Sequence, residues 1–491
     1  MISELNQNLN KLIGADAGYS LIIKGPPGSG KTTFALSLLE SLLNTHKILY
    51  FSTRIGDVSL YQQFPWLKKI EKNIRILVVT EQFLSEIYKE EPEEEYKEAA
   101  RKFLKELNKK REVGRIYINE LLKDKRVPEI KHLYREINSA LPEKSIIVID
   151  SLEGITGKYN INEAMFAYMI QNDLVESADA TVIFVSEKES ESMEDYVVDG
   201  IINISYSIED GRRIRKFTLK KLRGGEINTS SYAFTLDSGR FYVFQPLEIR
   251  GKINKSWRAI PEKDGMYSTG IKDLDKLLGG GIRYGSFFNI QVEGNVLPEA
   301  WRIFETPIII NFFSLNYGVF AIPTPGYSYD ANRRYFSQWI PGEMLDKNTC
   351  YIDYSIAESK RENVVALGGM DPKKAAEIHR GKVKEFIEKY EKTLFILNYD
   401  FLEYSIGPDE ALKNIFANLT RLKSSKSIAL AITKPGQKIN KEIKNIADYV
   451  MILTTINGAT FIYGIKPRTI YYGIEIDEKM GFPYLKLVPM V

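Results

Sequence analysis

Short apolar runs alternate with amphipathic stretches along the first half of the chain, a pattern that predicts a parallel sheet flanked by helices. The run at residues 20–24 ends in a glycine-rich turn, and residues 31–43 follow with apolar side chains on one helical face. Further strands are expected at residues 47–51, 74–80, 145–150 and 180–186. Segments typical of antiparallel strands close this half, at residues 200–206, 213–222 and 231–243.

The second half partly repeats this pattern after a polar stretch at residues 246–265, which is the candidate linker. A helix between glycines is expected within residues 267–281 and a strand at 287–292, followed by apolar runs at 308–313 and 317–322. Runs at residues 394–399, 427–433 and 447–454 take the places of 146–150, 180–186 and 198–206. We expect an α/β protein with two tandem domains, residues 1–245 and 266–491, the second a drifted copy of the first.

Residues 84–140 are dense in Glu and Lys with helical apolar spacing, and they predict a helical insertion in the first domain. A charged run of this kind favours a solvated helix face over a binding surface.

Composition and charge exclude several classes of protein. A chain of 491 residues is too long for one hydrophobic core. Its 67 basic and 64 acidic residues leave a net charge of +3, which gives no global attraction to nucleic acid or to an anionic membrane. Cys350 is the only cysteine, so a cysteine metal cage is excluded. No apolar run is long enough to span a bilayer, so the cytoplasm is expected, and the frequent Lys, Glu, Ile and Tyr favour a thermophilic source.

The glycine-rich turn carries the strongest chemical signal. It fits the pattern G-x-x-x-x-G-K-[ST] in full, between an expected strand and helix. Backbone N–H groups of such a loop face phosphates, and the helix adds the positive end of its dipole. Lys31 is expected to reach the β- and γ-phosphates of ATP, and the Thr32 hydroxyl to bind Mg²⁺. The expected nucleotide-binding residues are Gly25, Pro26, Pro27, Gly28, Ser29, Gly30, Lys31, Thr32 and Thr33.

Asp150 is the second candidate for the metal. It follows four β-forming residues, 146–149, at the carboxyl end of an expected strand. A carboxylate at that edge can hold Mg²⁺ through water, whereas the alternative is an ordinary cap or turn residue. The phosphate loop in the same chain favours the metal role for Asp150.

Several of these segments resemble the KaiC/RadA branch of the RecA superfamily. Residues 149–154, 195–202 and 221–224 are similar to KaiC motifs in the first half, as are 268–271 and 277–282 at the opening of the second. The resemblance implies RecA-like folds for both domains. The chain looks closest to the archaeal gas-vesicle regulators of the GvpD family, with similar residues at 52–54 and 61–66. Proteins of that family act in transcriptional control through protein partners.

The resemblance also suggests how subunits would meet. In KaiC proteins, the Lys and Arg of the element similar to residues 221–224 reach the neighbouring subunit's γ-phosphate. Lys221 and Arg223 are therefore candidates for this role, and they imply a homo-oligomer. The alternative is that both are surface charges on a strand whose Leu222 faces the other way.

The chain departs from those relatives at the residue that activates water. KaiC and RadA proteins carry a glutamate just after the second strand, where this chain has Thr53 and Arg54. An arginine cannot accept a proton at neutral pH, so slow hydrolysis is expected. Glu187, which follows the strand at 180–186, is a candidate substitute for this glutamate. The other predicted catalytic residues are Lys31 and Asp150. The alternative for Glu187 is a solvated loop acid, which is the more ordinary interpretation.

The second half lacks a phosphate loop. The corresponding residues 293–300 read EGNVLPEA, with no Gly-Lys-Ser/Thr and with Glu293 and Glu299 where phosphates would lie. We therefore expect a degenerate nucleotide site in the second domain and one nucleotide per chain.

Two functions remain open at this point. The first is a slowly hydrolysing, KaiC-like ATPase that acts as a nucleotide-dependent oligomeric switch on protein partners. The second is a RadA-like, DNA-stimulated ATPase. The basic cluster at residues 211–216 is expected at an exposed hairpin turn, which is ordinarily solvated, and its alternatives are a contact with phosphate backbones or with an acidic partner. The near-neutral net charge does not favour nucleic acid.

Overall fold

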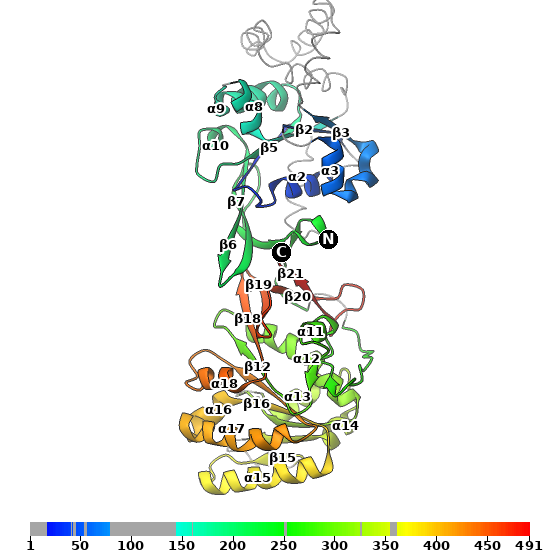
Figure 1. Ribbon diagram of the computed structural model, residues 1–491, viewed down its shortest axis with the longest axis vertical. Coiled ribbons are helices and arrows are strands. Elements are labelled where there is room, and N and C mark those ends of the chain that lie inside the picture. The colour runs from blue at the N-terminus through cyan, green and yellow to red at the C-terminus, as the bar shows by residue number, and fades with distance from the viewer. Residues whose placement is uncertain are drawn as a thin grey trace, which may run out of the picture. The chain divides into compact units, whose positions relative to one another are not determined.

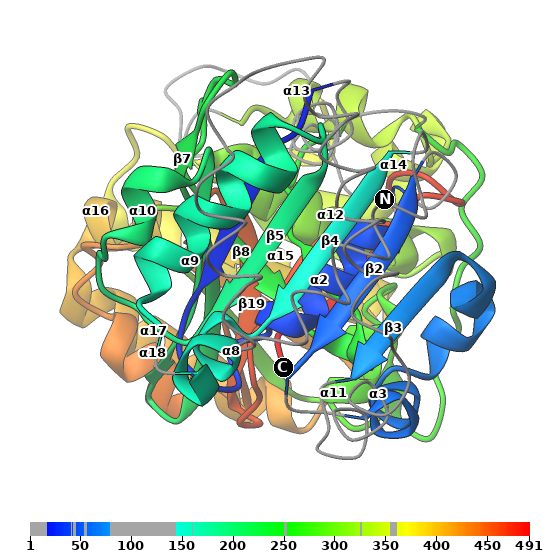
Figure 2. The same cartoon turned by 90° about the horizontal axis from the view of Figure 1, so that it is seen from above.

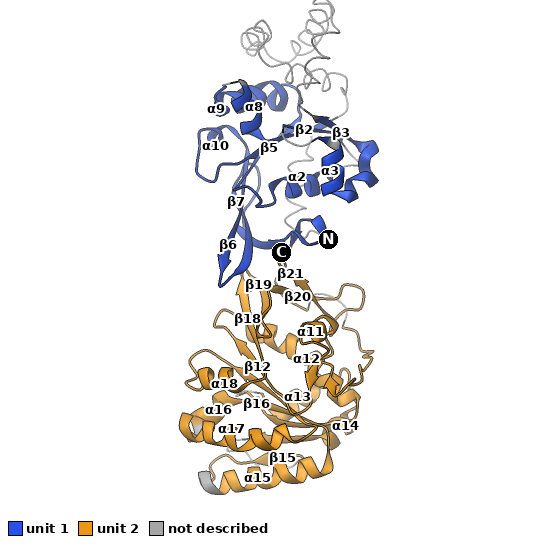
Figure 3. Ribbon diagram, viewed as in Figure 1, with its two compact units in different colours: residues 1–244, 491 blue, residues 245–490 orange. Residues whose placement is uncertain are grey.

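The computed structural model describes residues 17–40, 42, 46–53, 56–78, 144–159, 161–249, 253–324, 327–353 and 361–491. The chain divides into two compact units, unit 1 with Met1–Phe244 and Val491, and unit 2 with Gln245–Met490 (Figure 3). The predicted insertion at 84–140 lies outside the described residues. Residues of the predicted linker pack on unit 2, where the Asn254 amide donates to the Phe482 carbonyl at 2.7 Å.

Unit 1 is built on a sheet whose order is β3-β2-β4-β5-β1-β6-β7-β8-β9 (Figure 1). The strands from β3 to β6 are parallel, whereas β6 to β9 form an antiparallel meander. The strands are β1 (Ser20–Lys24), β2 (Lys47–Ser52), β3 (Ile74–Val78), β4 (Ser145–Asp150), β5 (Thr181–Ser186), β6 (Gly200–Glu209), β7 (Arg212–Leu222), β8 (Ser231–Thr235) and β9 (Tyr242–Val243).

The parallel strands of unit 1 are buried on both faces, as their continuous apolar runs predict. Alternate side chains of each strand enter two separate core clusters, one packed on α2 and the other on α8 and α9. Figure 2 shows β5, β4, β2 and β3 side by side, as their pairing requires. The helices are α2 (Lys31–Glu40), α3 (Asp57–Gln63), η1 (Pro65–Asn73), α8 (Leu152–Tyr159), α9 (Glu163–Ile170), η2 (Gln171–Glu176), α10 (Glu194–Val197) and η3 (Asp237–Gly239).

Unit 2 holds a larger sheet with the order β15-β14-β13-β16-β17-β12-β18-β19-β20-β21, and a separate pair, β10 and β11. Its strands are β10 (Met266–Tyr267), β11 (Ile282–Arg283), β12 (Phe287–Val292), β13 (Gly318–Ile322), β14 (Thr349–Asp353), β15 (Val364–Ala366), β16 (Thr393–Asn398), β17 (Ile428–Thr433), β18 (Tyr449–Ile456), β19 (Ala459–Lys466), β20 (Tyr472–Ile476) and β21 (Leu485–Pro489). Its helices are α11 (Lys272–Leu277), α12 (Pro298–Ser314), α13 (Tyr329–Phe336), α14 (Gly342–Asn348), α15 (Pro372–Lys389), α16 (Tyr399–Ile406), α17 (Pro408–Lys423) and α18 (Asn440–Ile446).

The two sheets share one strand order. In unit 1, β1 lies between β5 and β6, and β4 lies between β2 and β5. In unit 2, β12 lies between β17 and β18, and β16 lies between β13 and β17. The fold prediction, two α/β domains of RecA type with mostly parallel sheets flanked by helices, is therefore confirmed.

Two details refine the sequence-based expectation. The expected strand at 231–243 is broken into β8 and β9, because Ser238 adopts a left-handed backbone with φ of 55° between them. The apolar run at 308–313 forms the end of helix α12. Within the described part of the chain, no helix is long and apolar enough to cross a bilayer.

A buried ion pair holds the segment after β5 against β1. The Lys24 side chain is only 1% exposed, and its ammonium contacts the Asp195 carboxylate at 2.8 Å. The same ammonium donates to the Ser190 carbonyl at 2.7 Å and the Ser192 hydroxyl at 2.8 Å. Residues 187–199 therefore close over the end of β1.

We predict that Asp195→Ala lowers the free energy of unfolding by about 3 kcal/mol, because it leaves a buried ammonium without its counter-charge. Urea unfolding of the whole chain measures the change. The double variant Lys24→Met, Asp195→Leu removes both charges and should recover most of the loss. A single variant as stable as the parent would contradict this account.

Candidate phosphate-binding site

The loop between β1 and α2 is shaped by close contacts that only glycine permits. Gly25 has a φ of 155°, and a Cβ there would lie 2.0 Å from the Ile204 carbonyl oxygen of β6. Gly30 has a φ of 107°, and a Cβ there would lie 2.9 Å from the side chain of Leu236. The loop is thus pressed against the antiparallel meander, with the helix start at Lys31 directly behind it. This geometry fits a phosphate cradle.

Lys31 is buried at the centre of this loop. Its ammonium donates to the carbonyls of Gly25 at 2.7 Å and Pro26 at 2.9 Å. It also pairs with the Glu187 carboxylate at 3.0 Å. The structure therefore brings together Lys31 and the residue predicted as a substitute base. Phosphate oxygens bound in the loop would compete with Glu187 for the same ammonium.

The two residues predicted to hold Mg²⁺ are also adjacent. The Thr32 hydroxyl donates to Oδ2 of Asp150 at 2.7 Å, where β4 ends. The buried Tyr50 hydroxyl donates to the same oxygen at 2.5 Å. Burial, followed by the nearby Asp150 charge, raises the pKa of Tyr50 well above its usual value, so Tyr50 stays a neutral donor. A hydroxyl and a carboxylate in contact fit Mg²⁺, which takes few protein oxygens and keeps water and phosphate ligands.

Glu153 is a site residue that sequence reasoning missed. It lies in the first turn of α8, and its Oε1 accepts from the Ser186 hydroxyl and from the Glu187 amide at 3.1 Å. Its Oε2 is buried and has no hydrogen-bond partner among the described residues. Its position could have indicated this role. Glu153 follows Asp150 by three residues, and in the first turn of a helix this spacing places its side chain near the same edge of the sheet.

The departure at the water-activating position has a structural counterpart at Thr53. Its hydroxyl donates to the Asp150 carbonyl at 3.1 Å and accepts from the Ser151 amide at 2.9 Å. Thr53 thus joins the end of β2 to the end of β4. Arg54 lies outside the described residues.

The interpretation of residues 211–216 as an exposed basic turn is only partly confirmed, because the cluster borders a hairpin turn but two of its arginines are buried. The turn is at Asp210 and Gly211, and Arg212 and Arg215 are buried side chains of β7. Arg215 donates to the Ser29 carbonyl at 3.0 Å and the Gly28 carbonyl at 3.3 Å, and it also donates to the carbonyl of Val491. Burial lowers its pKa to about 10, so it stays charged at neutral pH and supports the phosphate loop from behind.

Lys221 and Arg223 both have partners within the chain. Lys221 donates to the carbonyls of Asp195 at 2.9 Å and Val198 at 2.6 Å. Arg223, whose side chain is 60% exposed, pairs with Asp199 at 2.7 Å. Both cations thus contact residues 195–199, which follow Glu187. Their predicted role in a neighbouring subunit's site stays a prediction.

The carboxyl ends of the parallel strands in unit 2 correspond to the phosphate-loop edge of unit 1, but they carry different charges. Glu299 lies in the first turn of α12, where α2 has Lys31. Lys434 follows β17 in the place that Glu187 takes after β5, and it pairs with Asp400 at 2.7 Å. Burial raises the pKa of Glu305 to about 8, so it carries mostly a proton at neutral pH. These residues do not form a phosphate cradle, and a degenerate second site stays a prediction.

Comparisons with known proteins agree with the loop geometry. Residues 9–220 match the model of the GvpD gas vesicle protein, P-loop domain. The whole chain is similar to two proteins of Halobacterium salinarum (strain ATCC 700922 / JCM 11081 / NRC-1). It is 23% identical to Protein GvpD2 over 518 residues, covering 100% of this chain and 97% of the relative. It is 23% identical to Protein GvpD1 over 547 residues, covering 99% and 96%. The predicted resemblance to GvpD proteins is confirmed, and within unit 1 it is the match of residues 9–220 to the GvpD P-loop domain.

We predict that Arg215→Met weakens ATP binding about tenfold or more, because the loop carbonyls lose their charged donor. The control is Arg213→Met, which removes an exposed cation of the same strand. Calorimetric titration with MgATP compares the two. Equal affinities in both variants would contradict the supporting role of Arg215.

We also predict one ATP per wild-type chain and none for Lys31→Ala, because unit 2 lacks a lysine at its helix start. Equilibrium dialysis measures the stoichiometry, and a matched Lys434→Ala variant should still bind one ATP. A wild-type value near two would contradict the prediction of a degenerate second site.

Proposed function

We propose that this chain is an ATP-binding regulator in the gas-vesicle context, which hydrolyses ATP slowly and whose nucleotide state controls its self-association and its hold on a protein partner. The observation that supports this most directly is the phosphate loop with Thr32 in contact with Asp150, 2.7 Å apart. Lys31, Thr32 and Asp150 would hold MgATP, whose bound metal offsets charge on the phosphates. The similarity to the two GvpD proteins supports the regulatory role.

Slow hydrolysis is supported by where the carboxylates lie. Glu187 is engaged by Lys31, and one oxygen of Glu153 is engaged by Ser186 and the Glu187 amide. Thr53, at the usual glutamate position, holds β2 to β4 through its hydroxyl. A water at the γ-phosphate would then lack a base at the position after the second strand, and positioning the nucleophile is a main part of phosphoryl-transfer catalysis.

A nucleotide-dependent switch is supported by the contacts that connect Lys31, through Glu187, to residues 195–199. A γ-phosphate that takes over the Lys31 ammonium releases the Glu187 carboxylate at the start of residues 187–199. The far end of that segment carries the carbonyls and the carboxylate that hold Lys221 and Arg223. Met193 and Tyr196, which are 70% and 76% exposed, lie on the same segment. The segment thus joins the nucleotide to two cations and to exposed apolar side chains.

We predict that ATP, but not ADP, promotes self-association, and that Arg223→Ala weakens it while the chain still binds ATP. Arg223 is exposed and its pairing with Asp199 adds little stability, so the fold should be retained. Light scattering with ATP, ADP or no nucleotide measures the mass. Lys220→Ala, which removes an exposed cation of β7 three residues before Arg223, is the control.

A wild-type chain that stays monomeric at micromolar concentration in all conditions would exclude the role of Arg223 in a neighbouring site. Phosphate release measured on the same samples should be well below the ~1–100 s⁻¹ of typical kinases. Stimulation of that release by single-stranded DNA would favour the RadA-like alternative.

A further inference from the structure

Unit 2 contains a cavity of about 430 Å³ on one face of its sheet, beneath α15, α16 and α17. The floor is formed by aromatic side chains of the strands, among them Phe287, Phe320 and Phe395. Leu419 of α17 and Ile406 of α16 contribute to the wall. The volume lies in the range of small-molecule sites, about 300–1,000 Å³, and is well above the about 150 Å³ of a cavity that binds benzene.

Small residues on α15 and before it leave this space open. Ala375 and Ala376 in the first half of α15 line the cavity, and so do Gly368 and Gly369 in the turn that precedes the helix. Further along the helix, the larger Phe386 is buried in the core. An apolar lining gives water few hydrogen bonds, and an apolar space without contents costs stability as its volume grows. The arrangement therefore favours an apolar occupant.

One buried polar atom beside the cavity lacks a partner among the described residues. His379 lines it from α15, and its Nε2 is buried without a hydrogen-bond partner among the described residues. Its ring packs edge-on against Phe320, with centroids 5.6 Å apart. Burial lowers the pKa of His379 to about 4, so the ring is uncharged at neutral pH. A neutral ring of this kind can donate or accept a hydrogen bond. A buried polar atom of this kind normally has a partner.

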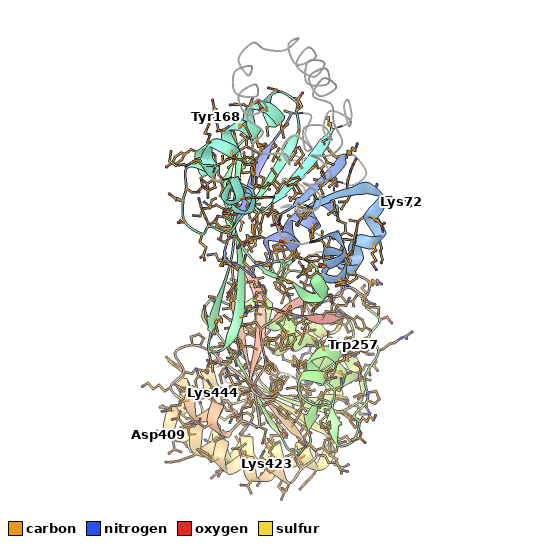
Figure 4. The ribbon with its side chains drawn as sticks, turned by 45° about the horizontal axis from the view of Figure 1, so that its top comes forward. Lys72, Tyr168, Trp257, Asp409, Lys423 and Lys444 are labelled. Carbon is orange, nitrogen blue, oxygen red and sulfur yellow. The ribbon has the colours of Figure 1, made fainter. Side chains whose placement is uncertain are left out.

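The cavity reaches the surface beside a single cation. Of its lining residues, Gly369, Met370, Asn418 and Arg421 are exposed, so they mark the mouth. Among the described residues of the lining, Arg421 is the only one with a full charge. It lies in the last turn of α17, the helix between Asp409 and Lys423 in Figure 4. An exposed guanidinium at the mouth of an apolar cavity suits an anionic group.

We propose that unit 2 binds a small amphipathic acid, whose apolar body fills the cavity, whose polar substituent bonds to His379, and whose anionic end lies at Arg421. This ligand site is separate from the phosphate loop, and it gives the second domain a binding task of its own. The Lys434 edge of the sheet takes no part in it, because the cavity is lined by other residues.

Two dyes of matched shape test the proposal on the full chain. Anilinonaphthalene sulfonate has aromatic rings, an N–H donor and an anion, and phenylnaphthylamine has the same rings and N–H without the anion. We expect saturable fluorescence enhancement with both in wild type. Arg421→Gln should weaken binding of the sulfonate about tenfold and leave the uncharged dye unchanged.

A second test fills the cavity with a larger side chain. Ala376→Phe should abolish binding of both dyes, whereas Ala417→Phe, the same change at an exposed position of α17, should leave both unchanged. If Ala376→Phe does not fold, as judged by circular dichroism and thermal unfolding, Ala376→Leu is the milder variant, with at least about a tenfold loss expected. Unchanged dye affinity in the folded cavity variant, or equal effects of Arg421→Gln on both dyes, would overturn the proposal.

Discussion

A buried ammonium group needs partners for its hydrogens, and the partners of Lys31 determine the arrangement around the phosphate loop. Two are carbonyls of the loop itself, so the lysine holds its own backbone in a tight ring. The third is Glu187, which directly follows β5, the strand beside β1, and it fixes where the chain leaves β5. Because β1, β4 and β5 are parallel neighbours, their carboxyl ends meet at one edge, and the loop, Asp150 and Glu187 lie there together.

The antiparallel part of the sheet also supports the phosphate loop. Arg215 comes from β7, in the antiparallel part of the sheet, and contacts the carbonyls of Ser29 and Gly28. Gly25 lies against the Ile204 carbonyl of β6. The same antiparallel strands therefore also fix the position of the loop relative to the sheet. The antiparallel strands therefore position the phosphate loop, although none of their side chains is expected to touch the nucleotide bound by the same chain. A RecA-like parallel sheet alone would leave the loop without this support.

Sequence reasoning found the parts of the site that depend on local pattern. The loop, the helix start at Lys31 and the carboxylate at the end of β4 follow from residue type and spacing within short segments. Arg215 and Glu153 were missed because their roles depend on which strand or turn lies beside them in space. The cluster at 211–216 was placed at a turn because its charges suggested exposure. The strand pairing extends to Arg212 instead, and Arg212 and Arg215 are buried while Arg213 is exposed. The cavity of unit 2 depends on helix packing and has no local signature.

The exchanged charges in unit 2 have a consequence for any attempt to build a phosphate site there. Glu299 stands where unit 1 has Lys31, and Lys434 stands where unit 1 has Glu187. A lysine restored at position 299 would face a like charge instead of a carboxylate, and it would follow a loop without the glycines of unit 1. A phosphate site in unit 2 would therefore need several simultaneous substitutions, because no one of them alone brings a lysine, a facing carboxylate and a glycine-rich loop together.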